Sequence, residues 1–488
     1  MQLHWFRSDL RIHDNTALHA AASQGAVIAV YLVTPQQWQQ HEDAACKVDF
    51  WRRQLIDLSQ QLAGLNIPLL IRHCDTWQDA PQQLLEVCQQ YDIQQLHCNA
   101  EYGFNERHRD AATRQLLQQH AIGFNRCLDQ LLFKPGSIRT QSDGYFKVFG
   151  QFKRVCQQRL YDQLPQVLPA PKPQAKLAIQ ADAIAQNLHD FSLGGYCLND
   201  ADQTSAATKI DSIATQWPVG EAHAMQRLAD FCADAILDYD KQRDLPALAG
   251  VSQLSPYINA GILSVRQCLQ AALQAANGEL FGGNEGVNTW ITQLLWREFY
   301  QHILVGFEQV SQHQPFKAQT NKLAWRHAPD DLARWQHGQT GFPIIDAAMR
   351  QLLHTGWMHN RLRMIVAMFL SKNLLIDWRL GEQWFMQHLI DGDLAANNGG
   401  WQWSASTGTD SVPYFRIFNP ITQSQKIDPE GAFIRQWLPE LAHLDNKSIH
   451  APHLSSKVNA LQLNYPAPML DLADSRKRAL AAFSALRD

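Results

Sequence analysis

The segment from Asp391 to Trp403, with the sequence DGDLAANNGGWQW, combines side chains that could bind a redox cofactor and pass it an electron. It places two carboxylates, two carboxamides and two glycines directly before two indoles. Glycines let the backbone approach a flat ligand closely, and acids and amides can bind a polar heterocycle, with Trp401 beside it as an electron donor. The pattern favours a cofactor pocket, and a capped loop is the structural alternative.

A second group of candidate residues lies on a predicted helix that begins at Thr289, TWITQLLWREFYQHI. Helical spacing puts five side chains on one face, with an amide and a guanidinium among aromatic rings: Trp290, Gln293, Trp296, Arg297 and Tyr300. An ordinary core stripe would not carry Arg and Gln at its centre. The alternative, a buried helix whose Arg is satisfied by the protein, stays open.

A third group lies on the helix predicted within TGWMHNRLRMIVAMF, where Asn360, Arg363 and Met364 share a face and Arg361 points to one side. An Arg inside such an apolar helix needs a carboxylate, because an unpaired buried charge costs several kcal/mol. We expect one of the two aspartates of the first segment to supply it. The alternative is an ion pair that only holds two helices together.

A fourth candidate is the loop YDKQRDLPALAGVSQLSPYINAG, which begins at Tyr239 and runs into a helix. Gly250, Ser252 and Ser255 bring small side chains, hydroxyls and exposed N–H groups to the helix start, which is a natural cradle for phosphate. Serine near a helix start is more often only a cap.

The elements that would position these residues fall into two kinds. Short apolar runs predict strands over 3–7, 26–33, 68–74 and 94–100, and amphipathic stretches predict helices over 15–24, 46–64, 79–91 and 105–121, the last with Asn105 as its N-cap. Alternating strands and helices indicate a doubly wound, Rossmann-like parallel sheet. No G-x-G-x-x-G follows the first strand, so a dinucleotide site of the usual type is not expected.

The remainder of the chain predicts a connection followed by a helical domain. Proline-rich and polar stretches, including residues 192–212, indicate a long connecting segment. Helical periodicity returns near Gly220 and continues to the end. We therefore expect an α/β domain over 1–133, a linker over 134–220 and an all-α domain over 221–488.

Composition limits the class of protein. The 488 residues include no apolar run long enough for a membrane helix, and the start, MQLHWFRSDLR, lacks the apolar core of an export signal. Nine cysteines without a C-x-x-C pair indicate reduced thiols of a cytosolic protein, with neither a disulfide framework nor a metal site. With a net charge of -4, any contact with DNA must come from a local basic patch.

Four motifs in this order, WREFY, GWMHNRLRM, DGDLAANNGGWQWSASTGTD and PYFRIFNP, resemble the DNA photolyase and cryptochrome family. Within it, the chain is most similar to the bacterial class I cyclobutane pyrimidine dimer photolyases. The resemblance runs from HWFRSDLRIHDN near the start to FIRQWLP near the end.

The resemblance implies a folded-over FAD in the helical domain, active in its reduced anionic form. The positions that match the family's phosphate and linker contacts are Tyr239, Val251, Ser252, Leu254 and Ser255. Trp290 and Arg297 would line the pocket. Around the ring the matching residues are Asn360, Arg363, Asp391, Asp393 and Asn397, the last beside the reactive N5 position.

The resemblance also implies a reaction and a substrate. In this family, light excites the reduced flavin, which passes one electron to a pyrimidine dimer flipped out of damaged DNA. Trp296 and Trp403 would sandwich the dimer. Gln293, Asn360 and Met364 would contact it, and phosphates would meet Arg243, Arg361, Arg416 and Lys426.

Three further tryptophans match the family's electron relay to the flavin: Trp401, Trp378 and Trp325. Without the resemblance, Trp378 and Trp325 would be assigned to the core.

Two positions depart from the family pattern. Gln293 stands where the dimer photolyases usually carry Glu, and it cannot supply a charge or a proton. This brings the site closer to (6-4) photolyases and animal cryptochromes, but Asn360 and Met364 stand where the (6-4) enzymes carry histidines. Dimer repair therefore remains the first expectation. A (6-4) photolyase, a blue-light cryptochrome and a light-independent flavin electron carrier are the alternatives.

For an antenna chromophore, the resemblance places Asn105 and Glu106 at the folate contacts, whereas Gln312 replaces a Lys that helps hold the folate. Methenyltetrahydrofolate is the first expectation, with a deazaflavin or an empty site as alternatives. The structural alternative for these two residues is a helix cap and a first-turn acid. We expect a bacterial, cytoplasmic monomer without a membrane partner, associated with the nucleoid when bound to DNA.

Overall fold

The computed structural model describes residues 1–182, 211–455, 458 and 463–486. The polar stretch over 192–212 therefore lies almost wholly outside the described residues. The chain forms two compact units that alternate along the sequence. Unit 1 comprises Met1–Leu237, Ser252–Glu308 and Ile390–Asp393, and unit 2 comprises Asp238–Val251, Gln309–Leu389 and Leu394–Asp488.

Unit 1 contains a parallel sheet with the strand order β3-β2-β1-β4-β5, as predicted for a doubly wound fold. The strands are β1 (Gln2–Phe6), β2 (Val27–Val33), β3 (Leu69–His73), β4 (Gln95–Asn99) and β5 (Gly123–Cys127). The strand β5 was not predicted. Its sequence, GFNRC, lies at the edge of the sheet and has no fully buried residue, whereas each of the other strands has at least three.

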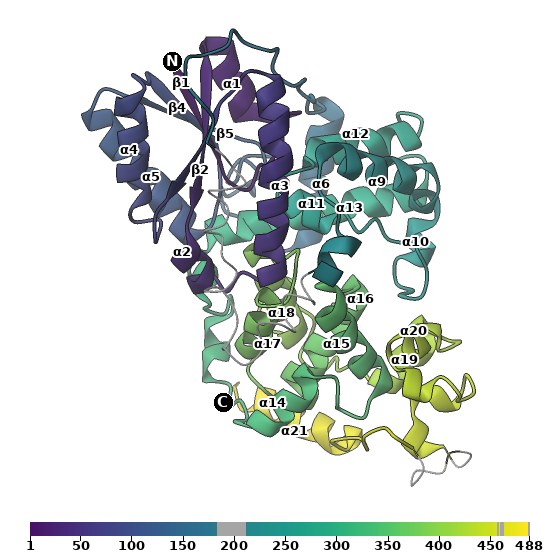
Figure 1. The fold of residues 1–488 in the computed structure, drawn as a ribbon. Helices are drawn as coiled ribbons and strands as arrows, with labels where there is room; N and C mark the ends of the chain where they lie inside the picture. Colours follow the sequence, from purple (N-terminus) through teal and green to yellow (C-terminus); the bar gives the residue numbers. More distant parts are fainter. Residues whose placement is uncertain (183–210, 456–457, 459–462, 487–488) are drawn as a thin grey trace. The chain divides into compact units, whose positions relative to one another are not determined.

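Helices cover both faces of this sheet, which explains why the strand β2 is apolar throughout. In β2, Val27, Ala29, Tyr31 and Val33 pack into one apolar cluster with α1 and α3. The alternate residues Ile28, Val30 and Leu32 pack into a second cluster with α4 and α5. Figure 1 shows α1 and α3 on one side of the sheet and α4 and α5 on the other.

The helices of unit 1 include all four that the sequence predicts before residue 122. The described α-helices are α1 (Thr16–Gln24), α2 (Pro35–Gln40), α3 (Ala45–Gly64), α4 (Ala80–Gln90), α5 (Phe104–Gln119), α6 (Phe149–Asp162), α9 (Glu221–Ala233), α11 (Ser255–Asn259), α12 (Val265–Ala275) and α13 (Glu285–Gly306).

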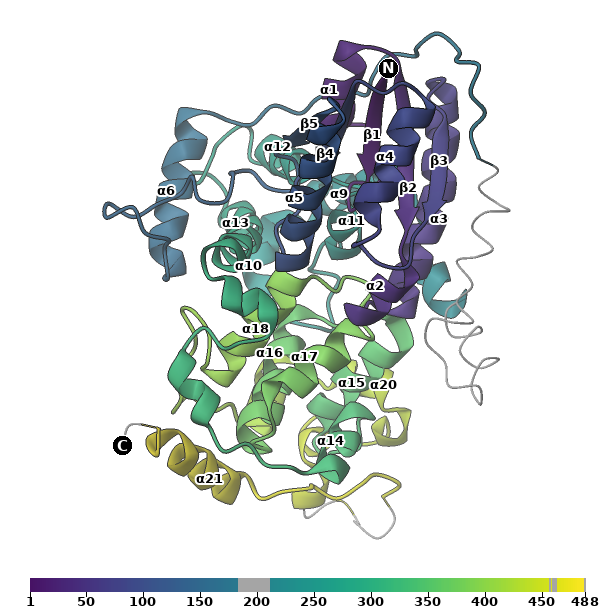
Figure 2. The same cartoon turned by 90° about the vertical axis from the view of Figure 1, so that its left-hand side faces the viewer.

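The helix α6 lies within the segment that the sequence predicts to be a connection. Its buried residues Phe149, Phe152, Cys156 and Leu160 recur at helical spacing. They give it one apolar face, and α6 lies beside α13 (Figure 1, Figure 2). The contacts include Phe149 with Trp296. The prolines on either side of this helix mask its periodicity in the sequence.

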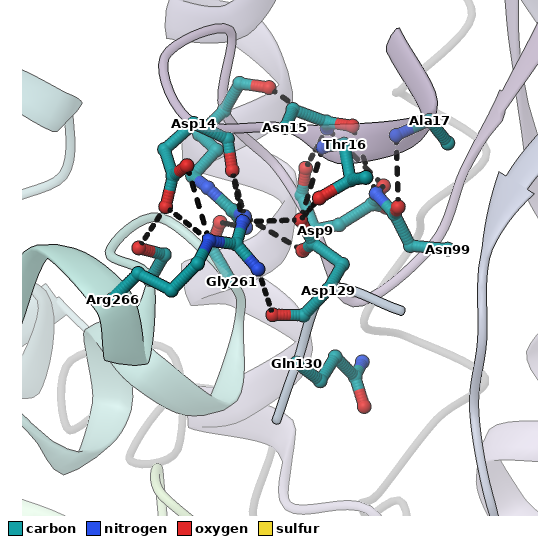
Figure 3. A network of polar contacts seen from close by, with 12 residues as sticks. Asp9, Asp14, Asn15, Thr16, Ala17, Asn99, Asp129, Gln130, Gly261 and Arg266 are labelled. Carbon is teal, nitrogen blue, oxygen red and sulfur yellow. Dashed lines mark hydrogen bonds and ion pairs between the residues drawn. The ribbon is translucent and has the colours of Figure 1, made fainter. Parts of the chain in front are cut away.

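A buried ion network fastens α12 to the loops that follow β1 and β5 (Figure 3). Arg266 lies 2.9 Å from Asp14 and 2.8 Å from Asp129, and Arg11 lies 2.6 Å from Asp129. Burial alone would raise the pKa of Asp129, but the two guanidinium groups outweigh it and hold this pKa well below its usual range. Removing one partner would leave a buried charge uncompensated, at a cost of about 3–5 kcal/mol.

Unit 2 is helical, and every described strand lies before residue 128, as predicted. Its described α-helices are α10 (Tyr239–Gln242), α14 (Pro329–Gln336), α15 (Pro343–Thr355), α16 (Asn360–Met368), α17 (Trp378–Met386), α18 (Leu394–Ala405), α19 (Pro420–Ile427), α20 (Ala432–Trp437) and α21 (Leu472–Ser484). The shorter 3-10 helices of unit 2 are η4 (Glu308–Gln312), which begins at the last residue of a unit 1 segment, η5 (Ala318–Lys322), η7 (Pro439–Leu441), η8 (Ser448–His450) and η9 (Pro452–Leu454), and its π-helix is η6 (Phe369–Asn373). The 3-10 helix η3 (Ala235–Asp238) lies mostly in unit 1. Within the described parts of the chain, no helix combines the length and the hydropathy needed to cross a membrane.

Candidate active site

The three tryptophans predicted to form a relay belong to a single apolar cluster of unit 2. Trp401 and Trp378 are buried members of this cluster, and Trp325 is half-buried and packs against it. The N–H of Arg326 donates to the Leu375 carbonyl at 2.7 Å, which ties the chain after Trp325 to the turn before α17. Two of the indoles are thus buried and the third is half-buried, and their role as a relay stays a prediction.

Trp401 fills its site tightly and keeps one polar atom unpaired. A Cβ atom on Gly381 would come within 2.1 Å of the Trp401 ring, so only glycine fits there. The ring of Phe385 lies 5.0 Å away, edge to face. Among the described residues, the buried Nε1 of Trp401 has no hydrogen-bond partner. An unpaired buried donor is uncommon, and it suits a polar ligand beside this indole.

Asn397 lies on α18, and its orientation is set by α17. Its Nδ2 donates to the backbone carbonyl of Glu382 at 2.9 Å. The Glu382 side chain is buried and accepts from Asn398 at 2.8 Å, and Asn398 in turn accepts from Gln402 at 2.8 Å. Glu382 is not predictable from the sequence, because its spacing from Asn397 matches no motif.

The turn that contains Asp391 and Asp393 lies in unit 1 and is held by donors from three helices. The Gly392 carbonyl accepts from Lys47 at 2.6 Å and from Asn259 at 3.1 Å. Gln301 donates to Asp393 at 3.3 Å. Lys47 is buried and also pairs with Asp43 at 2.6 Å. Lys47 and Asn259 were not predicted as part of the site. Their acceptor is a backbone carbonyl, which every residue type has, so the sequence at position 392 does not indicate that a donor is present.

The predicted face of α13 is present, and each polar member has a protein partner. Trp290 is buried against Phe231, with ring centroids 5.3 Å apart. Arg297 donates to the Gln130 carbonyl at 2.6 Å, as the structural alternative for this Arg expects. Gln293 is half-buried and donates to the Thr289 carbonyl one turn earlier at 3.2 Å.

Trp296, on the same helix, is half-buried and stacked on another ring of unit 1. Its centroid lies 3.6 Å from that of Phe149 on α6, and the two planes are nearly parallel at 13°. One face of the indole is therefore covered by the protein. Tyr300 is a second neighbour, with its ring centroid 5.6 Å from that of Trp296. The predicted stacking of a base would therefore use the face that Phe149 does not cover.

On α16 the predicted residues lie at the start of the helix. Asn360 is exposed at its first position, and Arg361, Arg363 and Met364 are half-buried. Arg361 pairs with Asp244, a partner that was not predicted for it. Arg363 donates through Nε to the Met358 carbonyl at 2.8 Å, and its pairing with an aspartate of the 391–393 turn stays a prediction.

The residues predicted to hold the FAD phosphates and linker fall in both units. Tyr239 and Val251 belong to unit 2, as does the predicted DNA contact Arg243, and Ser252, Leu254 and Ser255 belong to unit 1. Leu254 occupies the N-cap position of α11 without a side-chain cap, and Ser255 follows it as an exposed first residue. The alternative in which a serine caps this helix is therefore wrong. The remaining predicted DNA contacts lie in unit 2, where Trp403 is half-buried and Arg416 and Lys426 are exposed.

At the predicted antenna site, Asn105 does not cap its helix. Gly103 is the N-cap of α5, and the expectation for Asn105 is wrong because the helix begins at Phe104, one residue before it. The Asn105 amide instead lies 3.0 Å from Nε2 of His41. Glu106 is a first-turn acid, as expected. Burial, reinforced by the Glu101 carboxylate, raises the pKa of Glu106 to about 7.

The raised pKa predicts that Glu106→Gln changes how stability depends on pH. The unfolded carboxyl group titrates near 4.5 and the folded one near 7, so wild-type protein loses stability as pH rises through this window. Gln does not titrate. Relative to wild type, the variant should therefore gain about 2–3 kcal/mol between pH 4 and pH 8, as measured by urea unfolding. The exposed Glu86 of α4 supplies a control, Glu86→Gln. Parallel pH curves for wild type and Glu106→Gln would contradict the prediction.

Comparisons with known proteins give the same assignment for both parts of the chain. The family model for DNA photolyase matches residues 2–173, and the model for the FAD binding domain of DNA photolyase matches residues 290–485. A deoxyribodipyrimidine photo-lyase of Salmonella typhimurium is 43% identical over 99% of this chain and 98% of its own length.

Two solved structures agree with these matches. A class III photolyase from Agrobacterium tumefaciens superposes with a TM-score of 0.85 at 32% identity, covering 100% of this chain and 97% of that one. A cryptochrome from Synechocystis superposes with a TM-score of 0.83 at 27% identity, covering 99% of each chain. Sequence identity of 43% across the whole chain, joined to both matched domains, makes this protein a member of the DNA photolyase family.

Proposed function

We propose that this protein repairs cyclobutane pyrimidine dimers in DNA by light-driven electron transfer from bound reduced FAD. The similarity to deoxyribodipyrimidine photo-lyases over the full chain supports this activity. The structural observation that carries it is the cluster that joins Trp325, Trp378 and Trp401 in unit 2. Such indoles could transfer electrons from the protein surface to a buried cofactor.

The residues around Asn397 fit a reduced flavin. FAD, when bound, supplies the one-electron chemistry. Asn397 commits an N–H to the Glu382 carbonyl, so its Oδ1 is left to accept from a protonated ring nitrogen such as N5. The unpaired Nε1 of Trp401 also suits a polar ligand.

The further flavin residues carry over from the family motifs. In this proposal, Asp391, Asp393, Asn360 and Arg363 surround the ring, where a guanidinium stabilises negative charge. Lys47 and Asn259 hold the carbonyl of the turn between the two aspartates and thereby fix it. The set that binds phosphates, linker and pocket wall is Tyr239, Val251, Ser252, Leu254, Ser255, Trp290 and Arg297.

DNA contacts in this proposal combine stacking with phosphate binding. The dimer, flipped out of the helix, would stack on Trp296 and Trp403. Polar and apolar contacts would come from Gln293, Asn360 and Met364. Positive charges that meet the backbone would be Arg243, Arg361, Arg416 and Lys426, which supply the local basic patch that the net charge of -4 makes necessary.

The proposal extends to domains and cellular setting. We assign residues 1–133 to an antenna-binding domain in which Asn105 and Glu106 hold the chromophore, with methenyltetrahydrofolate as first candidate. Residues 134–220 would form the linker and 221–488 the domain that binds FAD and DNA. The protein would act as a monomer in a bacterial cytoplasm and join the nucleoid through DNA.

A second candidate, a blue-light receptor without repair activity, is favoured by two observations. The Synechocystis cryptochrome shares the fold along 99% of the chain, and Gln293 replaces the Glu usual in dimer photolyases. A (6-4) photolyase is favoured by Gln293 alone.

One experiment separates these functions. Reduced protein is incubated with oligonucleotides that carry either a cyclobutane dimer or a (6-4) product, in blue light and in darkness, and restored pyrimidines are measured by chromatography. We expect restoration only of the cyclobutane dimer and only in light. Restoration of the (6-4) product instead would establish the (6-4) activity. Restoration of neither lesion by flavin-loaded protein would favour the receptor.

A further inference from the structure

Lys372 is a buried lysine whose partners all lie on one loop. It belongs to the π-helix η6, and its side chain has no exposed surface. Its Nζ donates to the Arg416 carbonyl at 3.0 Å and to the Pro413 carbonyl at 3.5 Å. A π-helix within an α-helical run is rare and often marks a functional position.

Two further contacts hold the same loop. Lys317 donates from Nζ to the hydroxyl of Ser411 at 2.6 Å and to the Ser406 carbonyl at 3.3 Å. Directly after the loop, the N–H of Phe418 donates to the sulfur of Met368 at 3.2 Å. The loop over 406–416 is therefore contacted by two lysine side chains, Lys317 and Lys372, and the residue 418 that follows it is contacted by the thioether of Met368.

Burial of a lysine ammonium without a carboxylate partner costs free energy of folding, so Lys372 is expected to have a role beyond packing. Among the described residues, no carboxylate lies within ion-pair distance of Lys372. Burial, with the nearby cations Lys317 and Arg416, lowers the pKa of Lys372 to about 7. Asp410 is the acid that acts on Lys317. An apolar residue of similar length would avoid this cost, so stability alone does not explain the lysine.

The other side of the loop faces the solvent. Arg416 is exposed, and the loop follows three residues after Trp403. The carbonyl that Lys372 binds belongs to Arg416 itself, so the position of the ammonium fixes the backbone from which that guanidinium projects.

We propose that Lys372 is a positioning residue for DNA binding, which holds the Pro413–Arg416 backbone so that Arg416 meets a phosphate in one geometry. This inference rests on the proposed contact between Arg416 and DNA. Bound phosphate also favours the charged form of Lys372. DNA affinity should therefore fall as pH rises above 7, because the neutral amine binds the carbonyls more weakly.

The test is a double-mutant cycle on affinity for dimer-containing DNA, measured in darkness with holoenzyme. Lys372→Met and Arg416→Ala should each weaken binding by about tenfold, and the double variant should bind almost as Arg416→Ala does. At saturating DNA, the light-driven repair rate of Lys372→Met should equal that of wild type. Between pH 6.5 and pH 8.5, wild-type affinity should fall by about threefold beyond any fall in Lys372→Met.

The controls separate the possible failures. Lys477→Met removes an exposed cation from α21 and should leave affinity unchanged within about twofold. If Arg416→Ala binds as wild type, the proposed DNA contact is wrong. If Arg416→Ala weakens binding but Lys372→Met does not, or if the two effects add, the positioning role is wrong. If Lys372→Met does not fold, Lys372→Gln replaces it in the double-mutant cycle. If DNA affinity then depends on pH in the same way for wild type and Lys372→Gln, the inference is wrong.

Discussion

Phenylalanine in place of Trp325 is expected to slow photoreduction of the bound oxidised flavin by at least about tenfold, because a phenyl ring is far harder to oxidise than an indole and breaks the series Trp401, Trp378, Trp325. The structural cost should be small. Trp325 is half-buried at the margin of the cluster, and Phe keeps an aromatic ring against it. The measurement is the absorbance of the flavin under blue light with an external reductant.

The cluster also supplies a matched control. Trp384 is a second half-buried indole that packs against the same apolar residues but does not belong to the proposed relay. Trp384→Phe should photoreduce at the wild-type rate. Both variants should repair dimers normally after chemical reduction, because repair starts from the reduced cofactor. If Trp384→Phe is slow and Trp325→Phe is normal, electrons enter through Trp384 and the assignment of Trp325 is wrong.

The fold was predictable where burial imposes a pattern on consecutive residues. The strand β2 reads VIAVYLV because helices cover both of its faces, so every position must be apolar. The edge strand β5 reads GFNRC, since only part of it is covered, and it was missed. The other edge strand, β3, was predictable because its first three residues, Leu69, Leu70 and Ile71, are apolar and buried. The half-buried strand β5 is instead defined by its pairing with β4, which the sequence does not show.

Candidate site residues could be proposed from the sequence only within long motifs. Asn397, Trp401 and the 391–393 turn lie in a single stretch whose residue types indicate their chemistry. The groups that hold them are remote, as Lys47 is from Gly392, or have a backbone carbonyl as partner, as Asn397 has in Glu382. A carbonyl belongs to every residue type. Such contacts depend on the fold and have no sequence pattern of their own.

Charge partners show the same limit. An Arg in the apolar helix α16 indicates that a carboxylate is needed, but not which one. Arg361 pairs with Asp244, 117 positions earlier in the chain. Pairing of Arg363 with an aspartate of the 391–393 turn stays a prediction. The same holds for Arg266, which reaches Asp14 across 252 positions.

Trp296→Ala is expected to weaken binding of dimer-containing DNA by roughly 10- to 100-fold, since stacking of a base on an aromatic ring contributes about 1–3 kcal/mol. Phe149 covers one face of this indole at 3.6 Å, so the loss concerns stacking on the other face. Affinity for undamaged DNA should change little, because phosphate contacts dominate it. Fluorescence anisotropy with damaged and undamaged oligonucleotides measures both, and absorbance should show that the flavin stays bound.

Phe149 provides the matched variant. Phe149→Leu keeps an apolar side chain beneath Trp296 but removes the flat ring that holds the indole parallel to it. Affinity for damaged DNA should fall by only about threefold, because the indole remains but is less well oriented. If Trp296→Ala binds damaged DNA as wild type does, the stacking role is refuted. If instead both variants weaken binding of damaged and undamaged DNA equally, the ring pair supports the local fold and does not select the lesion.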